Sequence, residues 1–303
     1  MSIRELVVLG TASQVPTRQR AHHGALLLWD DEGILFDPGE GTQRQLTLAG
    51  VSASTITRIC ITHLHGDHCL GLPGVLQRMA LDGLARPVDL YYPADGQEYV
   101  DRLVRASIVH RLPEIRQHPV ASDGVVDTGP RFALHAHALD HSVTAYGWRL
   151  VETSRRRMRP DLLAERGIQG SEVGRLQAQG VIDVRGHTVR VEEVSDPRPG
   201  QVFAFVMDTR TCAGAAELAR GADLLVCEAT FLEEEAELAA AYGHLTATQA
   251  AHLALEAGAR RLVLTHFSQR HPDESLYGRE ARALFADVHA ARDLDRIRVP
   301  ARL

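Results

Sequence analysis

Short apolar runs alternate with helix-forming segments along most of this chain of 303 residues. The runs have the length of buried β-strands, as in "ELVVLG", "DLLVCEAT" and "RRLVLTHF". Helical segments lie between them, such as "TATQAAHLALEAGA", which Thr246 or Thr248 can cap and Gly258 can end. Mixed strands and helices predict an α/β layered fold in which helices cover the sheets.

Two local patterns refine this expectation. "GALLLWD" and "GILFDPG" predict a hairpin that turns between Asp30 and Gly33. "CLGLPGVLQRMALDG" predicts one helix whose first turn holds Pro73. The hydrophobic content of 45% is ample for a large buried core.

The regular apolar pattern fails between residues 152 and 194. This segment is rich in Arg, Gln, Gly and Glu and has little to bury, so we interpret it as a protruding arm inserted into a single domain of residues 1–303. The net charge of −6 excludes binding of nucleic acid by global attraction, so a polyanion would need a local basic patch. Such a patch stands at Arg155, Arg156, Arg157 and Arg159, although a solvated charge run is an equal alternative.

The sharpest chemical signal is His63-Leu64-His65-Gly66-Asp67-His68, directly after the predicted strand "RICIT". Four side chains that can bind metal within six residues can divide between two neighbouring ions. Imidazole nitrogen and carboxylate oxygen suit zinc or manganese, and the absence of cysteine from the motif argues against a purely structural site. A histidine-rich surface loop is the weaker alternative.

Other predicted strands also end in residues that bind metals. Asp208 ends "FVMD", His266 ends "LVLTH", and His141 follows "RFALHAHAL". Two cations held about 3.5–4 Å apart need a shared anion, which we assign to Asp208. Taken singly, each of these residues is more often structural. Several other histidines are not assigned to the site: His135 and His137 are expected to be structural residues within a strand, and His22 and His23 to face solvent or the substrate.

Compartment and redox state follow from what the sequence lacks. The chain shows neither a long uncharged apolar stretch nor a signal-peptide pattern, so we expect a cytoplasmic protein without membrane association. Its four cysteines have no paired spacing and are expected to be free.

These motifs resemble the metallo-β-lactamase superfamily, and within it the ribonuclease Z family. The resemblance spans essentially the whole chain and is weakest in the arm. It is carried by segments in the family's order: "FDPGEGTQRQL", "HGDHCLGLPGVLQRM", "HSVTAYGWRLVE", "VMDTR", "CEATF" and "LVLTHFSQRH".

The resemblance implies a four-layer αββα sandwich with an inserted tRNA-binding arm, two Zn²⁺ per chain (Mn²⁺ or another divalent metal being possible) and a homodimer. It places His63, His65 and His141 on one metal, Asp67, His68 and His266 on the other, and Asp208 between them. Asp37 and the GEGTQ turn would orient the ligand imidazoles through their other ring nitrogens. Arg20, Arg155, Arg156 and Arg157 would contact the substrate.

The chain departs from the family pattern at three places. Ala21 follows Arg20 where the family's N-terminal loop has Asn, a loop associated with selecting substrates by their 3′ sequence. Two further segments resemble the family's HEAT and HST motifs, but Cys227 precedes Glu228 in the first and Leu245 follows His244 in the second, so Glu228 and His244 match while these neighbours do not. The arm tip reads "GIQGSEVG" in place of the family's Gly-Pro tip.

The implied activity is endonucleolytic removal of the 3′ trailer from tRNA precursors, leaving a 3′-hydroxyl on the tRNA. Asp67 would orient or deprotonate the attacking water, and His244, held by Glu228, would protonate the leaving 3′ oxygen. One alternative is a small-molecule phosphodiesterase, sulfatase or lactonase on the same fold. Another is a tRNA-binding or metal-storage protein without catalysis.

Overall fold

The computed structural model describes residues 4–109 and 111–301. The chain divides into two compact units. The main unit comprises Met1–Thr128, Leu134–Leu150 and Val202–Leu303, and the second unit, called the arm below, comprises Gly129–Ala133 and Val151–Gln201. The segment 152–194 predicted as an insertion falls within the arm, which continues to Gln201.

The first sheet of the main unit has the strand order β18-β1-β2-β3-β4-β5-β6. The predicted hairpin is confirmed, since β2 and β3 pair antiparallel with Trp29 opposite Glu32. Strands β3 to β6 are parallel, so their carboxyl ends share one edge. The strand bounds are β1 (Arg4–Gly10), β2 (Gly24–Trp29), β3 (Glu32–Phe36), β4 (Ile56–Cys60), β5 (Val88–Pro93), β6 (Ile115–Val120) and β18 (Arg296–Arg298).

The second sheet has the order β17-β16-β15-β14-β9-β8-β7. Strands β14 to β17 run parallel, and they include the apolar runs that the sequence predicts before Asp208, Glu228 and His266. The strand bounds are β7 (Gly124–Thr128), β8 (Phe132–Leu139), β9 (Ala145–Glu152), β14 (Val202–Val206), β15 (Leu224–Glu228), β16 (Leu262–Thr265) and β17 (Val288–Ala290).

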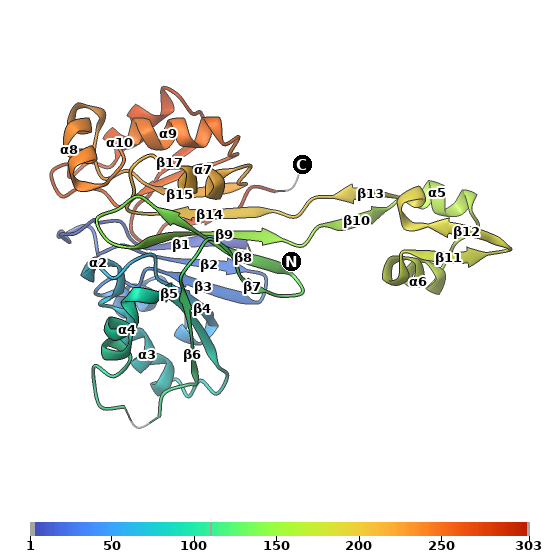
Figure 1. Cartoon of the computed structure of the whole chain (residues 1–303), viewed down its shortest axis with the longest axis horizontal. Coiled ribbons are helices and arrows are strands. Elements are labelled where there is room, and N and C mark those ends of the chain that lie inside the picture. Colours follow the sequence, from blue (N-terminus) through green and yellow to red (C-terminus); the bar gives the residue numbers. More distant parts are fainter. Residues whose placement is uncertain (1–3, 110, 302–303) are drawn as a thin grey trace. The chain divides into compact units, whose positions relative to one another are not determined.

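Helices cover the outer faces of both sheets (Figure 1). One core joins the first sheet to α1, α3 and α4, and another joins the second sheet to α7, α9 and α10. Between the sheets, the ring of Phe36 on β3 stacks on that of Phe205 on β14, with centroids 4.6 Å apart. These layers give the expected αββα sandwich. The helices are α1 (Thr42–Leu48), α2 (Gly66–Cys69), α3 (Leu72–Leu81), α4 (Gln97–Val104), α7 (Ala213–Ala219), α8 (Ala236–Tyr242), α9 (Ala247–Glu256) and α10 (Ser275–Arg282), with 3-10 turns η1 (Ala53–Thr55), η2 (Ala94–Gly96) and η4 (Glu233–Glu235).

Helix boundaries follow local chemistry with one correction. Thr246, not Thr248, caps α9, in a reciprocal capping box with Gln249. The helix predicted after His68 is confirmed as α3, which begins at Leu72 with Pro73 in its first turn, but Cys69 belongs to the preceding short helix α2. Between the two helices, position 71 must be glycine, because a Cβ there would lie 1.9 Å from the carbonyl oxygen of Gly39.

The arm has its own apolar core, so the expectation that it has little to bury is wrong. Helices α5 (Pro160–Glu165) and α6 (Ser171–Gln179) pack with strands β11 (Val181–Val184) and β12 (His187–Arg190) and with η3 (Val191–Val194). Strands β10 (Arg155–Met158) and β13 (Ser195–Arg198) form a separate antiparallel ladder. The apolar residues of this core are short and scattered among charged ones: Leu163, Ile168, Leu176, Ile182, Val184, Val189, Val191 and Val194.

None of the described helices combines the length and the apolar character needed to cross a membrane. The four cysteines are free, as expected.

Candidate metal centre

The predicted metal ligands come together within the main unit, where several strands end. His63 lies three residues beyond β4, His65 caps the start of α2, and Asp67 and His68 lie in its first turn. The second sheet supplies the others: His141 follows β8, Asp208 follows β14, and His266 directly follows β16.

Three side chains at the centre stand on left-handed backbone. Asp37, Asp208 and His266 have φ values of 44°, 37° and 62°, each just after a strand. A left-handed conformation costs a non-glycine residue roughly 1–2 kcal/mol, so the surrounding fold must hold it. Such conformations gather at functional sites. Here the backbone turns sharply out of each strand at the residue whose side chain enters the centre.

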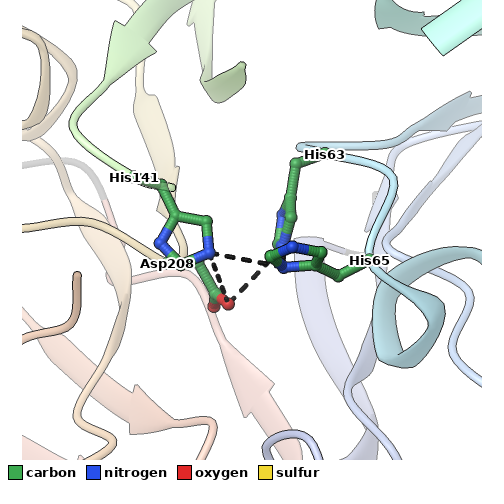
Figure 2. Close-up of side chains that lie close together, drawn as sticks. All are labelled: His63, His65, His141 and Asp208. Atoms are coloured by element: carbon green, nitrogen blue, oxygen red, sulfur yellow. Dashed lines mark hydrogen bonds and ion pairs between the residues drawn. The ribbon is translucent and has the colours of Figure 1, made fainter. Parts of the chain in front are cut away.

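Two groups of potential ligands form, and in each group the candidate ligand atoms all lie within 4.8 Å of one another. The first is His63, His65, His141 and Asp208, whose side chains point toward a common centre in Figure 2. The second is Asp67, His68 and His266. This division matches the two ligand sets that the family resemblance implies.

Asp208 lies between the two groups. Its Oδ2 atom is 3.6 Å from His63 Nε2 in the first group and 3.4 Å from His68 Nε2 in the second. Its Oδ1 atom lies 3.3 Å from His266 Nε2. A carboxylate in this position can bridge two cations.

Each of four ligand imidazoles is fixed by a contact to the ring nitrogen that faces away from the centre. Fixing that nitrogen sets the orientation and tautomer of the ring, which leaves the other nitrogen free to bind metal. The contacts are His63 Nδ1 to Thr62 Oγ1 at 3.0 Å, His68 Nδ1 to Asp37 at 2.9 Å, His141 Nδ1 to the Gly243 carbonyl at 3.0 Å, and His266 Nδ1 to Thr230 Oγ1 at 2.9 Å.

Asp37 holds the turn from which His63 and His68 reach the centre. Its carboxylate accepts hydrogen bonds from the Thr62 amide at 2.7 Å and the Thr62 hydroxyl at 2.8 Å, besides the contact to His68. The following GEGTQ turn packs closely against α2. A Cβ at Gly39 would lie only 2.2 Å from the Asp67 carbonyl oxygen, so a side chain cannot fit there.

Burial and neighbouring charges prepare the ligands for a cation. Burial lowers the pKa of His63 well below its usual value, which keeps the ring neutral. Burial would raise the pKa of Asp67, but the adjacent His68 and His266 hold it below its usual range. His63 therefore stays neutral and Asp67 anionic, which is the state that metal binding requires. His68 differs, because Asp208, Asp67 and Asp37 outweigh its burial and raise its pKa well above the usual value, so a metal ion there would replace a proton.

The donor set fits divalent metal ions. Ring nitrogens face one another at 2.9 Å between His63 and His65, and at 3.2 Å between His68 and His266. His68 and His266 each engage a partner through Nδ1, so in the neutral rings the two Nε2 lone pairs face each other, and a cation or a proton between them removes that repulsion. Asp208 Oδ1 is buried and makes no hydrogen bond with the described residues, so it also has capacity for a metal. Nitrogen and carboxylate oxygen without thiolate suit zinc or manganese.

A cavity opens onto the candidate metal centre, and its lining includes His65, Asp67, His141, Asp208 and His266. His244 faces this cavity from the loop between α8 and α9. Its Nδ1 atom donates to the Glu228 carboxylate at 3.1 Å. Burial disfavours the charged ring, but Glu228 and Asp208 outweigh that effect and raise the pKa of His244 to about 9. His244 also lies within ligand range of Asp208 and His266, so its position allows either a proton donor or a metal ligand. The metal content of a variant that lacks His244 distinguishes these two roles.

The other predicted site residues lie elsewhere. Arg20 is only 5% exposed and donates to the carbonyl oxygens of Ser268 and Pro272, so its guanidinium holds a loop and offers little surface to a substrate. His23 is fully buried, so the expectation that it faces solvent or substrate is wrong. His135 and His137 lie on β8 and belong to none of the described ligand groups, as expected.

The arm arginines differ among themselves. Arg155 and Arg157 are exposed on β10, whereas Arg156 is half-buried and donates from Nε to Ser195 Oγ at 2.7 Å. Within the arm, Arg155 and Arg157 therefore present charge to solvent, and Arg156 ties β10 to β13.

Sequence reasoning missed three supporting residues. Thr62 and Thr230 hold ligand rings, and a hydroxyl beside a ligand at the end of a strand would have been the signal for them. Gly243, at φ 78°, brings its carbonyl to His141, and a Cβ there would lie 2.9 Å from the His141 ring. That close approach has no signal in the sequence.

Comparison with known proteins points to one family. A model described as the metallo-β-lactamase superfamily matches residues 25–150, and one described as a β-lactamase superfamily domain matches residues 186–267. A ribonuclease Z of Nocardia farcinica is 59% identical over 304 residues, covering 100% of both chains. One of Thermobifida fusca is 55% identical, covering 100% of this chain and 96% of its own. The crystal structure of human tRNase Z, short form, is 26% identical with a TM-score of 0.73, covering 98% of this chain and 100% of its own.

Proposed function

The chain belongs to the ribonuclease Z family of the metallo-β-lactamase superfamily, and on that premise we propose that it removes the 3′ trailer from tRNA precursors. It acts as a metal-dependent endoribonuclease that hydrolyses one phosphodiester and leaves a 3′-hydroxyl on the tRNA. The observation that carries this proposal is the convergence of seven ligand-type side chains, in two groups with Asp208 between them.

We propose two zinc ions per chain as the resident metals, with manganese as the alternative that the same donors allow. His63, His65 and His141 would hold one ion, Asp67, His68 and His266 the other, and Asp208 both. When bound, such a pair lowers the pKa of a water molecule and offsets charge on the phosphoryl oxygens in the transition state.

Asp67 has a second role beside ligation. Its carboxylate is 8% exposed and lines the cavity, and its lowered pKa keeps it anionic. One of its oxygens can therefore accept a hydrogen bond from the attacking water and orient it toward phosphorus.

His244 protonates the leaving 3′ oxygen. An alkoxide leaves poorly without a proton, and a raised pKa of about 9 keeps the imidazole protonated at neutral pH. Glu228 orients this ring, and it also accepts from the Thr230 hydroxyl at 2.6 Å, which in turn contacts His266. Glu228 thus connects the proton donor to the metal centre.

The arm supplies affinity for the tRNA. We assign phosphate contacts to Arg155 and Arg157, since both side chains are exposed and guanidinium groups bind phosphate well. Arg156 contributes through the fold of the arm, because its guanidinium also donates to the Ser195 carbonyl.

Two further proposals rest on the family resemblance and on the substrate. We propose that the chain forms a homodimer, which a molar mass measured in solution at that of one chain would refute. We place the enzyme in the cytoplasm, where tRNA precursors would be available to it, and localisation of a tagged chain tests this assignment.

The decisive experiment is cleavage of a precursor tRNA with a defined 3′ trailer by the metal-loaded protein. The proposal expects one cut at the trailer junction and a 3′-hydroxyl product. Activity on bis-para-nitrophenyl phosphate with no cut in the precursor would identify a small-molecule phosphodiesterase instead. Absence of both activities would identify a binding protein.

A further inference from the structure

The wall of the metal cavity carries aromatic and cationic side chains that the metal chemistry does not use. The cavity has a volume of about 360 Å³, and its lining includes Phe231, Tyr242 and Arg270 beside the metal-centre residues. Tyr242 is 59% exposed, which is unusual for a large apolar ring beside a buried centre, whereas Phe231 is only 5% exposed.

These three side chains form an ordered set. The rings of Phe231 and Tyr242 are nearly parallel, with an angle of 11° between planes and centroids 6.5 Å apart. The Arg270 guanidinium lies over Phe231, 5.7 Å from its centroid. Phe231 also packs against the ring of His244, with centroids 5.9 Å apart. Tyr242 therefore presents its ring at the cavity, and Phe231 connects it to the proton donor.

The backbone fixes where Tyr242 stands relative to the chemistry. Tyr242 ends α8, the next residue Gly243 gives its carbonyl to His141, and His244 follows directly. Three consecutive residues thus supply an exposed ring, a contact to a metal ligand and the proton donor. Because His244 serves the leaving 3′ oxygen, the nucleotide that keeps this oxygen is the one nearest Tyr242.

We propose that Tyr242, supported by Phe231, stacks on the base of the nucleotide immediately 5′ of the scissile phosphate, and that Arg270 pairs with a phosphate of the same strand. This inference rests on the proposed function. An aromatic ring and a cation side by side are the usual means of binding single-stranded nucleic acid, because every base offers a π face. Stacking without base-specific hydrogen bonds also places no demand on the identity of the last retained base.

Arg270 is the weaker half of the subsite. Its side chain is about half exposed, and Glu235 lies 3.6 Å from it, which offsets part of its charge. The larger effect is therefore expected at Tyr242.

The test compares four substrates: precursor tRNA, the same RNA made abasic on the 5′ side of the cut, the RNA made abasic on the 3′ side, and bis-para-nitrophenyl phosphate. Tyr242→Ala should lower kcat/KM on precursor tRNA about 10- to 100-fold, the range for loss of one base-stacking contact. Tyr242→Phe should retain the activity. The 5′ abasic substrate should abolish the difference between wild type and Tyr242→Ala, the 3′ abasic substrate should preserve it, and the small diester should show none.

Tyr99→Ala is the matched control, since Tyr99 is 55% exposed but does not line this cavity. An equal loss in Tyr99→Ala, or a loss in Tyr242→Ala that persists on the 5′ abasic substrate, would overturn the proposal. Metal content measured for every variant separates a lost stacking contact from a damaged centre.

A binding experiment separates this inference from the proposed function. Mature tRNA carrying 5-iodouridine as its 3′-terminal nucleotide binds without being cut, and ultraviolet light should crosslink it to Tyr242. A crosslink at Tyr242 without any cleavage of precursor tRNA by the wild type would refute the function but keep the subsite. Cleavage with a crosslink mapped elsewhere would refute the subsite alone.

Discussion

The main unit and the arm both enclose apolar cores, but they place their charged groups in opposite ways. In the main unit, His63, His68 and Asp208 are buried, and the side chains of Thr62 and Asp37 fix the orientation of the two rings. On the arm, Arg155 and Arg157 stand in solvent on a two-stranded ladder. Hydrolysis needs reacting groups that the fold holds at short, fixed distances. Attraction to a polyanion needs only charge that is exposed to solvent. Mutations in the two regions should therefore differ in size and in which substrates they affect.

The largest effect is expected from removing the shared carboxylate. Asp208→Ala takes away a carboxylate that lies within 3.6 Å of a histidine in each group, so cleavage of precursor tRNA and of bis-para-nitrophenyl phosphate should both fall to background. Elemental analysis after reconstitution should show the metal lost as well. His65→Ala should behave alike. Two metals retained in either variant would contradict the assigned ligands.

Removing His244, the proposed proton donor, should affect the two substrates unequally. His244→Ala should slow cleavage of precursor tRNA by roughly 10²–10⁴, the range for loss of a general acid. The loss should shrink on bis-para-nitrophenyl phosphate, because para-nitrophenolate leaves without a proton. Rates on both substrates and metal content are the measurements.

Two further results test whether His244 acts as the proton donor. Glu228→Gln should give a milder form of the same pattern, since Glu228 orients the ring but donates no proton. Loss of metal in His244→Ala, or equal losses on both substrates, would make His244 a ligand or a part of the scaffold.

Loosening the support of the ligands should have an intermediate effect. Asp37→Asn weakens the contacts to His68 and Thr62, and loss of such a supporting group typically lowers metal affinity about 10- to 100-fold. Competition with a chelator measures the affinity, and activity should return at high metal concentration. A variant that stays inactive when saturated with metal would show that Asp37 acts directly in the chemistry.

The smallest effect is expected from the arm. The double variant Arg155→Gln, Arg157→Gln should weaken binding of precursor tRNA about tenfold at moderate salt. The slope of the logarithm of the binding constant against the logarithm of the salt concentration should become shallower by about 0.7–0.9 for each lost phosphate contact. Hydrolysis of the small diester should not change. Arg102→Gln, an exposed arginine of the main unit, is the control. Equal losses on both substrates would assign the arm arginines a structural role.

Arg156→Gln sharpens this comparison within the arm. Its guanidinium is bound to Ser195, so its loss should destabilise the β10–β13 ladder rather than remove a phosphate contact.

Sequence alone predicted the layered α/β fold and most of the side chains that gather at the candidate metal centre, because both follow from short-range patterns. Apolar runs of strand length place each following residue at a sheet edge, and His63, His65, Asp67 and His68 lie within six residues of one another. Such signals need no knowledge of how distant segments meet. The family resemblance then supplied the ligand sets and the roles of Asp37 and His244.

Only the tertiary structure decided what depends on contacts between distant segments. His23 and Arg20 are buried by segments that are distant in the sequence. The Gly243 carbonyl contacts His141, and the Thr230 hydroxyl contacts His266, although these residues have no periodic spacing in the sequence. The core of the arm was missed for the same reason, since its apolar residues are few and meet only when short elements fold together. The sequence determined which groups could bind metal, and the fold determined which nitrogen of each ring faces the centre, because packing and hydrogen bonds fix that orientation.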